Sequence, residues 1–151
     1  MKIAFVTQWY DPEGGSAAIP GAIARALQAR GHEVEVVTGY PNYPTGHLYA
    51  GYRIRLHHRE HIRGIAVNRL PLYPSHDGSA LRRMLNFVSF MVSASTAGVY
   101  IAKRSDVALV YSTPGTVGMA GLVLRRLLRR PFVLYVQDVW PDTVIATGML
   151  P

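Results

Sequence analysis

The N-terminal part of the chain contains two short apolar runs separated by one amphipathic stretch. The runs at 3–7 and 34–38 are rich in β-branched residues and too short for helices, which is typical of strands buried on both faces of a parallel sheet. Between them, Ile19, Ile23 and Leu27 recur at the four-residue spacing of one helix face. Two parallel strands joined by a helix form a right-handed βαβ unit. This beginning favours an α/β fold.

The rest of the chain continues the alternation of strands and helices. We expect further strands at 65–70, 107–111 and 132–136, the first of them as the second arm of a hairpin. Helices are expected at 79–103 and 117–130, and 39–51, with its prolines and glycines, is predicted to be a long ordered loop. Five strands in this arrangement predict a Rossmann-like, doubly wound parallel sheet. With the strands numbered along the chain, their expected order across the sheet is 3-2-1-4-5.

The predicted order also locates a ligand crevice. The order reverses between the first and fourth predicted strands, and doubly wound sheets bind ligands at the carboxyl ends of the strands beside such a reversal. The segments that follow the first, fourth and fifth strands are 8–16, 112–118 and 137–142, and we expect them to meet in one site. In the second of these, Ser112 and Thr113 can donate hydroxyl groups to an acceptor or simply begin a helix.

Gly14 and Gly15 lie in the loop after the first predicted strand. Glycine has no Cβ, so a phosphate can approach the backbone there, and the following helix directs its positive end at the loop. The pair is neither the three-glycine dinucleotide fingerprint nor a P-loop, because no Gly-Lys-Ser/Thr occurs in the chain. The two glycines therefore either contact a phosphate or only turn the chain. Ser16 is the expected N-cap of the helix.

The segment 137–142 concentrates side chains that can carry chemistry. Gln137 and Asp138, at the very end of the fifth strand, are the candidate catalytic residues, because a carboxylate there can take a proton or bind sugar hydroxyls. Trp140 either stacks on a sugar face or belongs to the core. Asp142 either binds the acceptor or caps the next helix.

Composition narrows the functional classes. Hydrophobic residues make up 49% and charged residues 17% of the chain, as in a globular domain, and the lack of cysteine excludes disulfides and thiolate metal sites. His57, His58 and His61 lack an evident further ligand, so no metal is expected. The middle third, 53–104, carries nine basic and two acidic residues. This excess either solvates a surface or suits phosphorylated ligands and anionic lipid; nucleic acid is not favoured, because aromatics are not interleaved with the arginines.

The predicted helix at 79–103 is unusually apolar, with no charged residue between Arg83 and Lys103. A membrane span is disfavoured, because it would place the first three strands across the bilayer from the fourth and split the sheet. We expect one row of apolar residues to face the sheet: Leu81, Leu85, Val88, Val92 and Val99. Other faces carry Met84, Phe87, Phe90 and Met91, which either pack on another helix or enter a membrane surface, with Arg82, Arg83 and Phe87 as the expected contacts.

Several motifs taken together point to a known family. They are Gly14-Gly15, Arg30-Gly31-His32-Glu33-Val34, the segments 39–46 and 71–76, and Asp138-Val139-Trp140-Pro141-Asp142. The chain resembles, from end to end, the N-terminal domain of retaining family-four glycosyltransferases with the GT-B fold. Within these it is most similar to the bacterial group that acts in colanic-acid and O-antigen assembly, including fucosamine transferases.

The resemblance implies that 1–151 is a truncated, acceptor-side domain whose partner domain, with a paired-glutamate donor site, is missing. It implies that Gly14 and Gly15 face the donor phosphates, and that Gln137 stands where many members have a histidine. The acceptor-binding residues that we expect are Asn42, Tyr43, Ser112, Thr113, Trp140 and Asp142.

Together with the apolar helix after Arg82 and Arg83, the resemblance leads us to expect a cytoplasmic enzyme that is peripheral on the inner membrane face. It is expected to use a nucleotide-sugar as co-substrate and to need no metal or other cofactor. Its expected partners are the nucleotide-sugar, a lipid-linked saccharide and an anionic membrane surface. The fragment by itself is expected to show no turnover. The rival interpretations are a non-catalytic saccharide- or nucleotide-binding module and a sugar-nucleotide epimerase of the same architecture.

Overall fold

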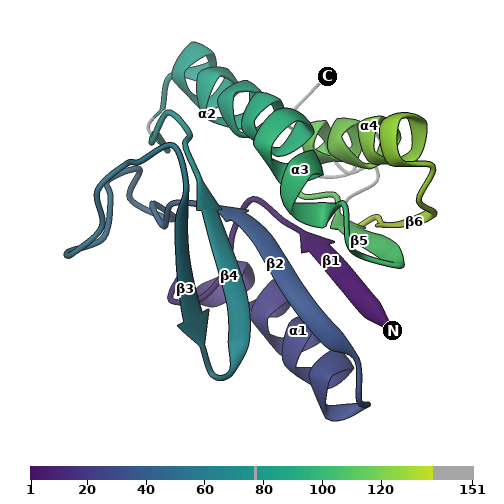
Figure 1. Ribbon diagram of the computed structural model, residues 1–151. Coiled ribbons are helices and arrows are strands. Elements are labelled where there is room, and N and C mark those ends of the chain that lie inside the picture. The colour runs from purple at the N-terminus through teal and green to yellow at the C-terminus, as the bar shows by residue number, and fades with distance from the viewer. Residues whose placement is uncertain (77, 138–151) are drawn as a thin grey trace.

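The computed structural model describes residues 1–76 and 78–137, and they form one six-stranded sheet with helices on both faces (Figure 1). The strands are β1 (Lys2–Val6), β2 (Glu33–Gly39), β3 (His58–Ile62), β4 (Ile65–Leu70), β5 (Val107–Tyr111) and β6 (Phe132–Tyr135). Their spatial order is β3-β4-β2-β1-β5-β6, and every neighbouring pair is parallel except the β3–β4 hairpin. The predicted order of the five parallel strands is confirmed, and β3 adds an antiparallel edge strand.

Two apolar layers hold the helices to the sheet. The helix α1 (Ile19–Ala29) covers one face, and α2 (Ala80–Ser93), α3 (Val99–Ala102) and α4 (Gly118–Leu128) lie along the other. Phe5 and Val36 belong to the first layer, whereas Val37 and Phe90 belong to the second. Each such side chain contributes roughly 1.5–3 kcal/mol when it is fully buried. Helices on opposite faces follow from winding the chain outward in both directions from β1.

The start of α1 differs from the prediction. Ser16 does not cap the helix, because a 3-10 turn (Gly15–Ala18) comes first and α1 begins at Ile19. Pro20 is tolerated in the first turn, where its missing N–H would have no helical partner. The Ser16 hydroxyl instead lies 3.4 Å from the Tyr43 hydroxyl, so Ser16 connects two loops.

The orientation predicted for α2 is wrong. Four of the five residues expected to face the sheet are exposed: Leu81, Leu85, Val88 and Val92. Phe90 and Asn86 point inward instead, and Asn86 is 2% exposed. The side-chain amide nitrogen of Asn86 donates to the Tyr73 carbonyl oxygen (2.6 Å), and its side-chain oxygen accepts from the Gln8 amide (2.5 Å). The buried polar contact of Asn86 rotates the helix and leaves an apolar row in solvent.

The helical stretch Ala80–Ala102 is the one helix in the described part of the chain that is long and apolar enough to cross a membrane, judged by length and composition alone. It runs from α2 through a π-helical turn (Ala94–Gly98) into α3. The turn adds a residue to the helical repeat, so Val99 faces the sheet core as predicted. Phe90, Ala94 and Ala102 also lie in that core, so this helical stretch packs on the sheet through the second apolar layer.

Candidate functional site

Loops that follow parallel strands meet at the carboxyl edge of the sheet. Because β1, β2, β4, β5 and β6 are parallel, the segments after them, including 8–16, 40–46, 71–76 and 112–118, all leave from that edge. This is where the strand order predicts the crevice. The segment 40–57 contains no helix or strand, as expected for the long loop.

A buried carboxylate joins the first two of these loops. Glu13 is 2% exposed and accepts backbone N–H groups from Asn42 (2.8 Å), Tyr43 (2.8 Å) and Tyr10 (3.0 Å). Burial raises the pKa of Glu13, and the three N–H groups oppose that shift. The loop after β1 and the loop after β2 are thereby fixed to each other directly before Gly14.

The glycine pair presents bare backbone at this edge. Gly14 and Gly15 are exposed, and a Cβ built on either would meet no atom within 4 Å. Gly15 has φ +63°, a conformation that side-chain-bearing residues rarely adopt. The space beside Gly14 is therefore open to a ligand, and no crowding within the protein prevents a side chain at position 14.

An aromatic cluster, formed by Trp9, Tyr43 and His76, lies across three of the loops. The ring centres of Trp9 and Tyr43 are 5.2 Å apart, and those of Tyr43 and His76 are 4.8 Å apart in an edge-to-face arrangement. Gly46 brings the loops together: it has φ +77°, and a Cβ there would lie 2.3 Å from the backbone nitrogen of His76. All three rings are partly exposed, so they can offer apolar surface to a sugar ring.

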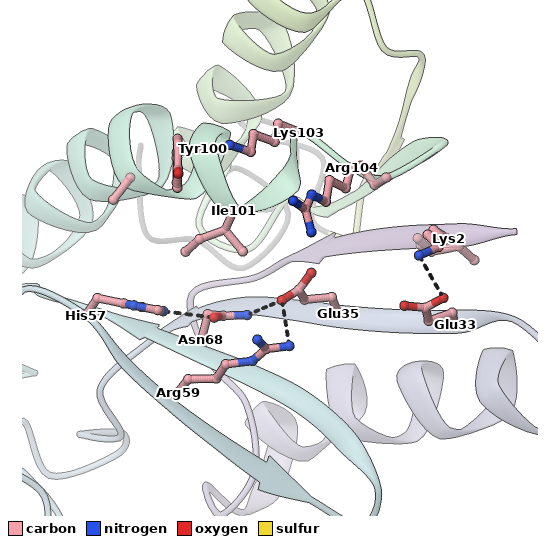
Figure 2. Close-up of a pocket in the computed structure, with 13 residues that line it drawn as sticks. Lys2, Glu33, Glu35, His57, Arg59, Asn68, Tyr100, Ile101, Lys103 and Arg104 are labelled. Carbon is pink, nitrogen blue, oxygen red and sulfur yellow. Dashed lines mark hydrogen bonds and ion pairs between the residues drawn. The ribbon is translucent and has the colours of Figure 1, made fainter.

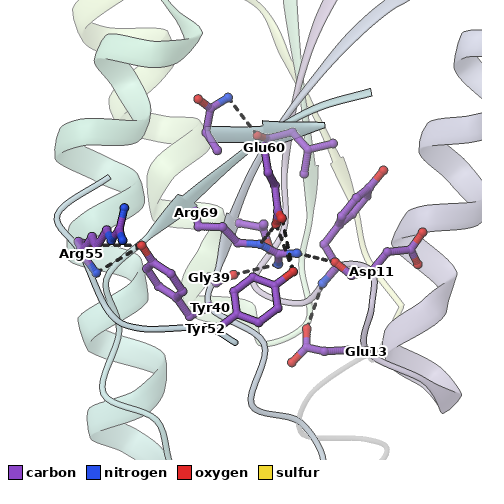
Figure 3. Close-up of polar contacts among 12 residues, drawn as sticks. Asp11, Glu13, Gly39, Tyr40, Tyr52, Arg55, Glu60 and Arg69 are labelled. Carbon is purple, nitrogen blue, oxygen red and sulfur yellow. Dashed lines mark hydrogen bonds and ion pairs between the residues drawn. The ribbon is translucent and has the colours of Figure 1, made fainter. Parts of the chain in front are cut away.

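A buried arginine supports these loops from below (Figure 3). Arg69, on β4, is completely buried; its Nε lies 2.7 Å from Oε1 of Glu60, and its guanidinium donates to the carbonyl oxygens of Gly39 (3.1 Å) and Asp11. The Tyr52 ring centre lies 5.2 Å from the guanidinium carbon. Arg69 therefore ties the end of β2, the β1 loop and the hairpin together.

The predicted residues on the other side of the site are only partly described. Ser112 and Thr113 follow β5 and are half-buried, and among the described residues the Thr113 hydroxyl has no hydrogen-bond partner. Gln137 is exposed and its side-chain oxygen accepts from the Tyr111 hydroxyl. Asp138, Trp140 and Asp142 lie outside the described residues.

Asn42 has an internal role in the structure. It is 1% exposed, and its amide donates to the carbonyl oxygen of Tyr40 at 2.9 Å. Its side-chain oxygen also lies 3.5 Å from the Asn86 amide nitrogen. Asn42 thus holds the loop in which Tyr43 is partly exposed, and its predicted contact with the acceptor stays a prediction.

Sequence reasoning missed Trp9, His76 and Glu13 as site residues. Trp9 lies two residues after the first predicted strand, inside the segment assigned to the crevice, so its position in the sequence could have indicated it. His76 ends one of the family-like motifs. Little in the local sequence distinguishes Glu13 from an exposed carboxylate, because two of its three partners come from a loop about thirty residues away.

The three histidines at 57–61 do not assemble into a metal site. Within residues 1–76 and 78–137, no group of three or more His, Cys, Asp or Glu side chains could hold a metal ion. Nε2 of His57 lies 2.8 Å from the side-chain oxygen of Asn68.

Comparison with known proteins identifies the family. Residues 14–149 match the model of the glycosyl transferase 4-like domain. The chain belongs to this family. It is 31% identical, over 152 residues, to a protein of Escherichia coli K12 described as the colanic acid biosynthesis glycosyl transferase WcaI. That alignment covers 99% of the chain but 37% of WcaI, so the chain spans little more than a third of this relative.

Solved structures place the glycosyl transferase 4-like domain within a fold class. Sucrose-phosphate synthase of Thermosynechococcus elongatus superposes with a TM-score of 0.64 at 15% identity, over 95% of this chain and 35% of the other. The catalytic domain of Arabidopsis thaliana starch synthase IV, bound to ADP and acarbose, gives 0.58 at 15% identity, over 89% and 33%. At these identities the likeness concerns the fold, which is the Rossmann-like α/β fold of GT-B glycosyltransferase catalytic domains.

Proposed function

We propose that this chain is the acceptor-side, N-terminal domain of a retaining GT-B glycosyltransferase that transfers a hexose-type sugar from a nucleotide-sugar to a lipid-linked saccharide in surface polysaccharide assembly. The observation that carries the proposal is the joining of the open glycine loop to the aromatic cluster through Glu13. A donor phosphate and an acceptor sugar ring need these two kinds of surface side by side.

In this proposal each element has a chemical role. The backbone at Gly14 and Gly15 faces the donor phosphates, whose charge is stabilised by dipoles and protein cations with no metal or other cofactor. Trp9 and Tyr43 offer ring surface to the acceptor sugar, and Ser112 and Thr113 offer hydroxyl groups to it. The catalytic group comes from the end of β6, at Gln137 or Asp138. The family match and the similarity to WcaI support the transfer reaction.

We expect Gly14→Ala to separate ligand binding from folding. The added methyl group meets no protein atom within 4 Å, so the thermal midpoint should stay within about 2 °C. In the full-length transferase the same methyl group would lie against the donor phosphates and raise KM for the nucleotide-sugar roughly tenfold. Steady-state sugar transfer with varied donor measures this.

The matched control for that experiment is Gly78→Ala, where a Cβ also meets open space. It should leave KM for the donor unchanged. An unchanged KM for the nucleotide-sugar in Gly14→Ala would show that the glycine loop does not contact the donor phosphates. Release of a free epimerised sugar without an acceptor would replace transfer by epimerisation.

Membrane attachment is part of the proposal and rests on the outward face of α2. The apolar row there consists of Leu81, Met84, Leu85, Val88 and Val92, all exposed, beside exposed Arg82 and Arg83. Phe87, expected as a contact, is half-buried. An amphipathic helix with arginines at its start suits the cytoplasmic face of a membrane that contains anionic lipid.

We expect the double variant Leu85→Gln/Val88→Gln to bind vesicles containing anionic lipid about thirtyfold more weakly than the unchanged protein. Each removed side chain forfeits roughly 1 kcal/mol of apolar transfer, and about 1.4 kcal/mol corresponds to a factor of ten. Co-sedimentation measures the bound fraction. Leu127→Gln, which changes an exposed leucine on α4, is the control. Equal binding of the double variant, or indifference to lipid charge, would contradict this attachment.

A further inference from the structure

The sheet face beneath α3 changes from apolar to polar along the strands. Toward the carboxyl ends, Val37 and Leu70 are buried in the core. Two positions earlier on each strand, and so on the same face, stand Glu35 and Asn68. The helix α3 ends at Ala102, and its residues Tyr100 and Ile101 line a hollow together with Glu35 and Asn68. This open hollow of about 700 Å³ remains between the end of α3 and the strands (Figure 2).

This amino-edge hollow is separate from the candidate functional site. Its polar lining includes Lys2, Glu35, Arg59, Asn68, Lys103 and Arg104. Lys2 and Glu35 lie near the starts of β1 and β2, whereas the candidate site lies beyond the ends of those strands. The proposed transfer reaction gives these residues no role.

A network of polar contacts holds the floor of the hollow in place. Asn68 is 1% exposed; its side-chain oxygen lies 2.8 Å from His57, and its amide donates to Oε1 of Glu35 at 3.0 Å. The Arg59 guanidinium lies 3.5 Å from the same oxygen. Among the described residues, Oε2 of Glu35 has no hydrogen-bond partner. The network thus fixes a carboxylate with one free acceptor oxygen.

The rim of the hollow carries positive charge that the protein does not neutralise. The Lys103 ammonium lies 3.8 Å from the centre of the Tyr100 ring, which holds it at the rim. Arg104 forms no ion pair with any described residue, and Figure 2 shows it projecting from the end of α3 toward Glu35. Lys2 and Arg59, by contrast, are paired with Glu33 and Glu35. Two cations therefore remain for a ligand.

We propose that the amino-edge hollow binds a saccharide unit that carries an acidic substituent, a carboxylate or a phosphate ester. A sugar hydroxyl donates one hydrogen bond and accepts another, so it fits between the free oxygen of Glu35 and the Arg104 guanidinium. A simple anion would gain nothing from Glu35, which repels it. A neutral sugar would leave Lys103 and Arg104 without a counter-charge. The combination selects a ligand with both hydroxyl groups and negative charge.

Calorimetric titration of the protein that carries this chain, at about 0.15 M salt to suppress unspecific attraction, tests the proposal. The probes are tetragalacturonate, glucose 6-phosphate, the neutral cellotetraose and inorganic phosphate. We expect both acidic saccharides to bind more tightly than cellotetraose and inorganic phosphate, and their ranking distinguishes a carboxylate from a phosphate ester. Equal binding of cellotetraose or of inorganic phosphate would overturn the proposal.

Variants then locate the binding. Arg104→Ala should weaken acidic-saccharide binding about tenfold, because one charge-assisted contact is lost. Tyr100→Phe keeps the ring beneath Lys103 and should bind normally, whereas Tyr100→Ala should weaken binding. Arg125→Ala, which removes one exposed positive charge from α4, is the matched control. An equal loss in Arg125→Ala would reduce the effect to net charge and overturn the site. These titrations contain no nucleotide-sugar, so their outcome does not depend on the proposed transfer reaction.

Discussion

Replacing Arg69 by methionine is expected to lower the free energy of unfolding by about 3–5 kcal/mol, because a buried charge network loses one partner. The side chain is completely buried, whereas its ion-pair partner Glu60 keeps 23% of its side chain exposed. Methionine fills much of the space but leaves the Glu60 carboxylate and the carbonyl oxygens of Gly39 and Asp11 without these donors. Urea denaturation followed by circular dichroism measures the loss.

The same hairpin supplies the control for this experiment. Arg59 also pairs with a glutamate, but its side chain is 56% exposed. Exposed pairs contribute about 1 kcal/mol or less, so Arg59→Met should be nearly neutral. The double variant Arg69→Met/Glu60→Met should recover part of the loss, because no charge is then left unpaired. If Arg69→Met destabilised no more than Arg59→Met, the buried network would not hold the loops.

Replacing Glu13 by alanine is expected to reduce sugar transfer by the full-length protein about 100-fold, a typical cost of misplacing substrate-positioning groups by an ångström. Three backbone N–H groups from two loops would lose their acceptor. The fall in unfolding free energy should be about 2–4 kcal/mol, since unsatisfied buried donors are costly. Transfer assays and denaturation of the same preparation measure both effects.

Glu13→Gln distinguishes the carboxylate from a mere space-filling group. Glutamine keeps one acceptor oxygen but turns an NH₂ group toward at least one N–H donor, so it should recover only part of the lost activity. Glu33→Gln, at an exposed position paired with Lys2, is the control and should have wild-type activity. Full activity of Glu13→Ala would show that the two loops keep their positions without the carboxylate.

The pH dependence of stability provides a second measure of Glu13. Its pKa is raised by burial, so the folded protein holds this proton to a higher pH than the unfolded chain does. The part of the Glu13 contribution to the free energy of unfolding that depends on protonation is therefore full below the ordinary carboxyl pKa and is lost as pH rises through the raised value. The difference in unfolding free energy between the unchanged protein and Glu13→Gln should shrink accordingly across that window. A difference that grows with pH would mean that the N–H groups outweigh burial.

The helix α2 shows how a local pattern can mislead. The row from Leu81 to Val92 has the spacing of a core-facing helix, yet these side chains are exposed. Asn86 decides the orientation, because a buried amide must find partners and finds them in Gln8 and the backbone of Tyr73. Gln8 lies in the loop after β1 and Tyr73 in the segment after β4. The sequence of the helix alone therefore does not show which of its faces is buried.

Local pattern alone determined the α/β class, the five parallel strands and the edge of the sheet where the loops gather. Apolar runs and helical spacing act over a few residues, and strand order with the handedness of crossovers then leaves few topologies. Only the tertiary structure decided that Glu13 joins two loops, that Trp9 and His76 lie beside Tyr43, and that Arg69 is buried beneath them. Each of these contacts joins residues far apart along the chain, and their energies exist only once the sheet has brought the loops together.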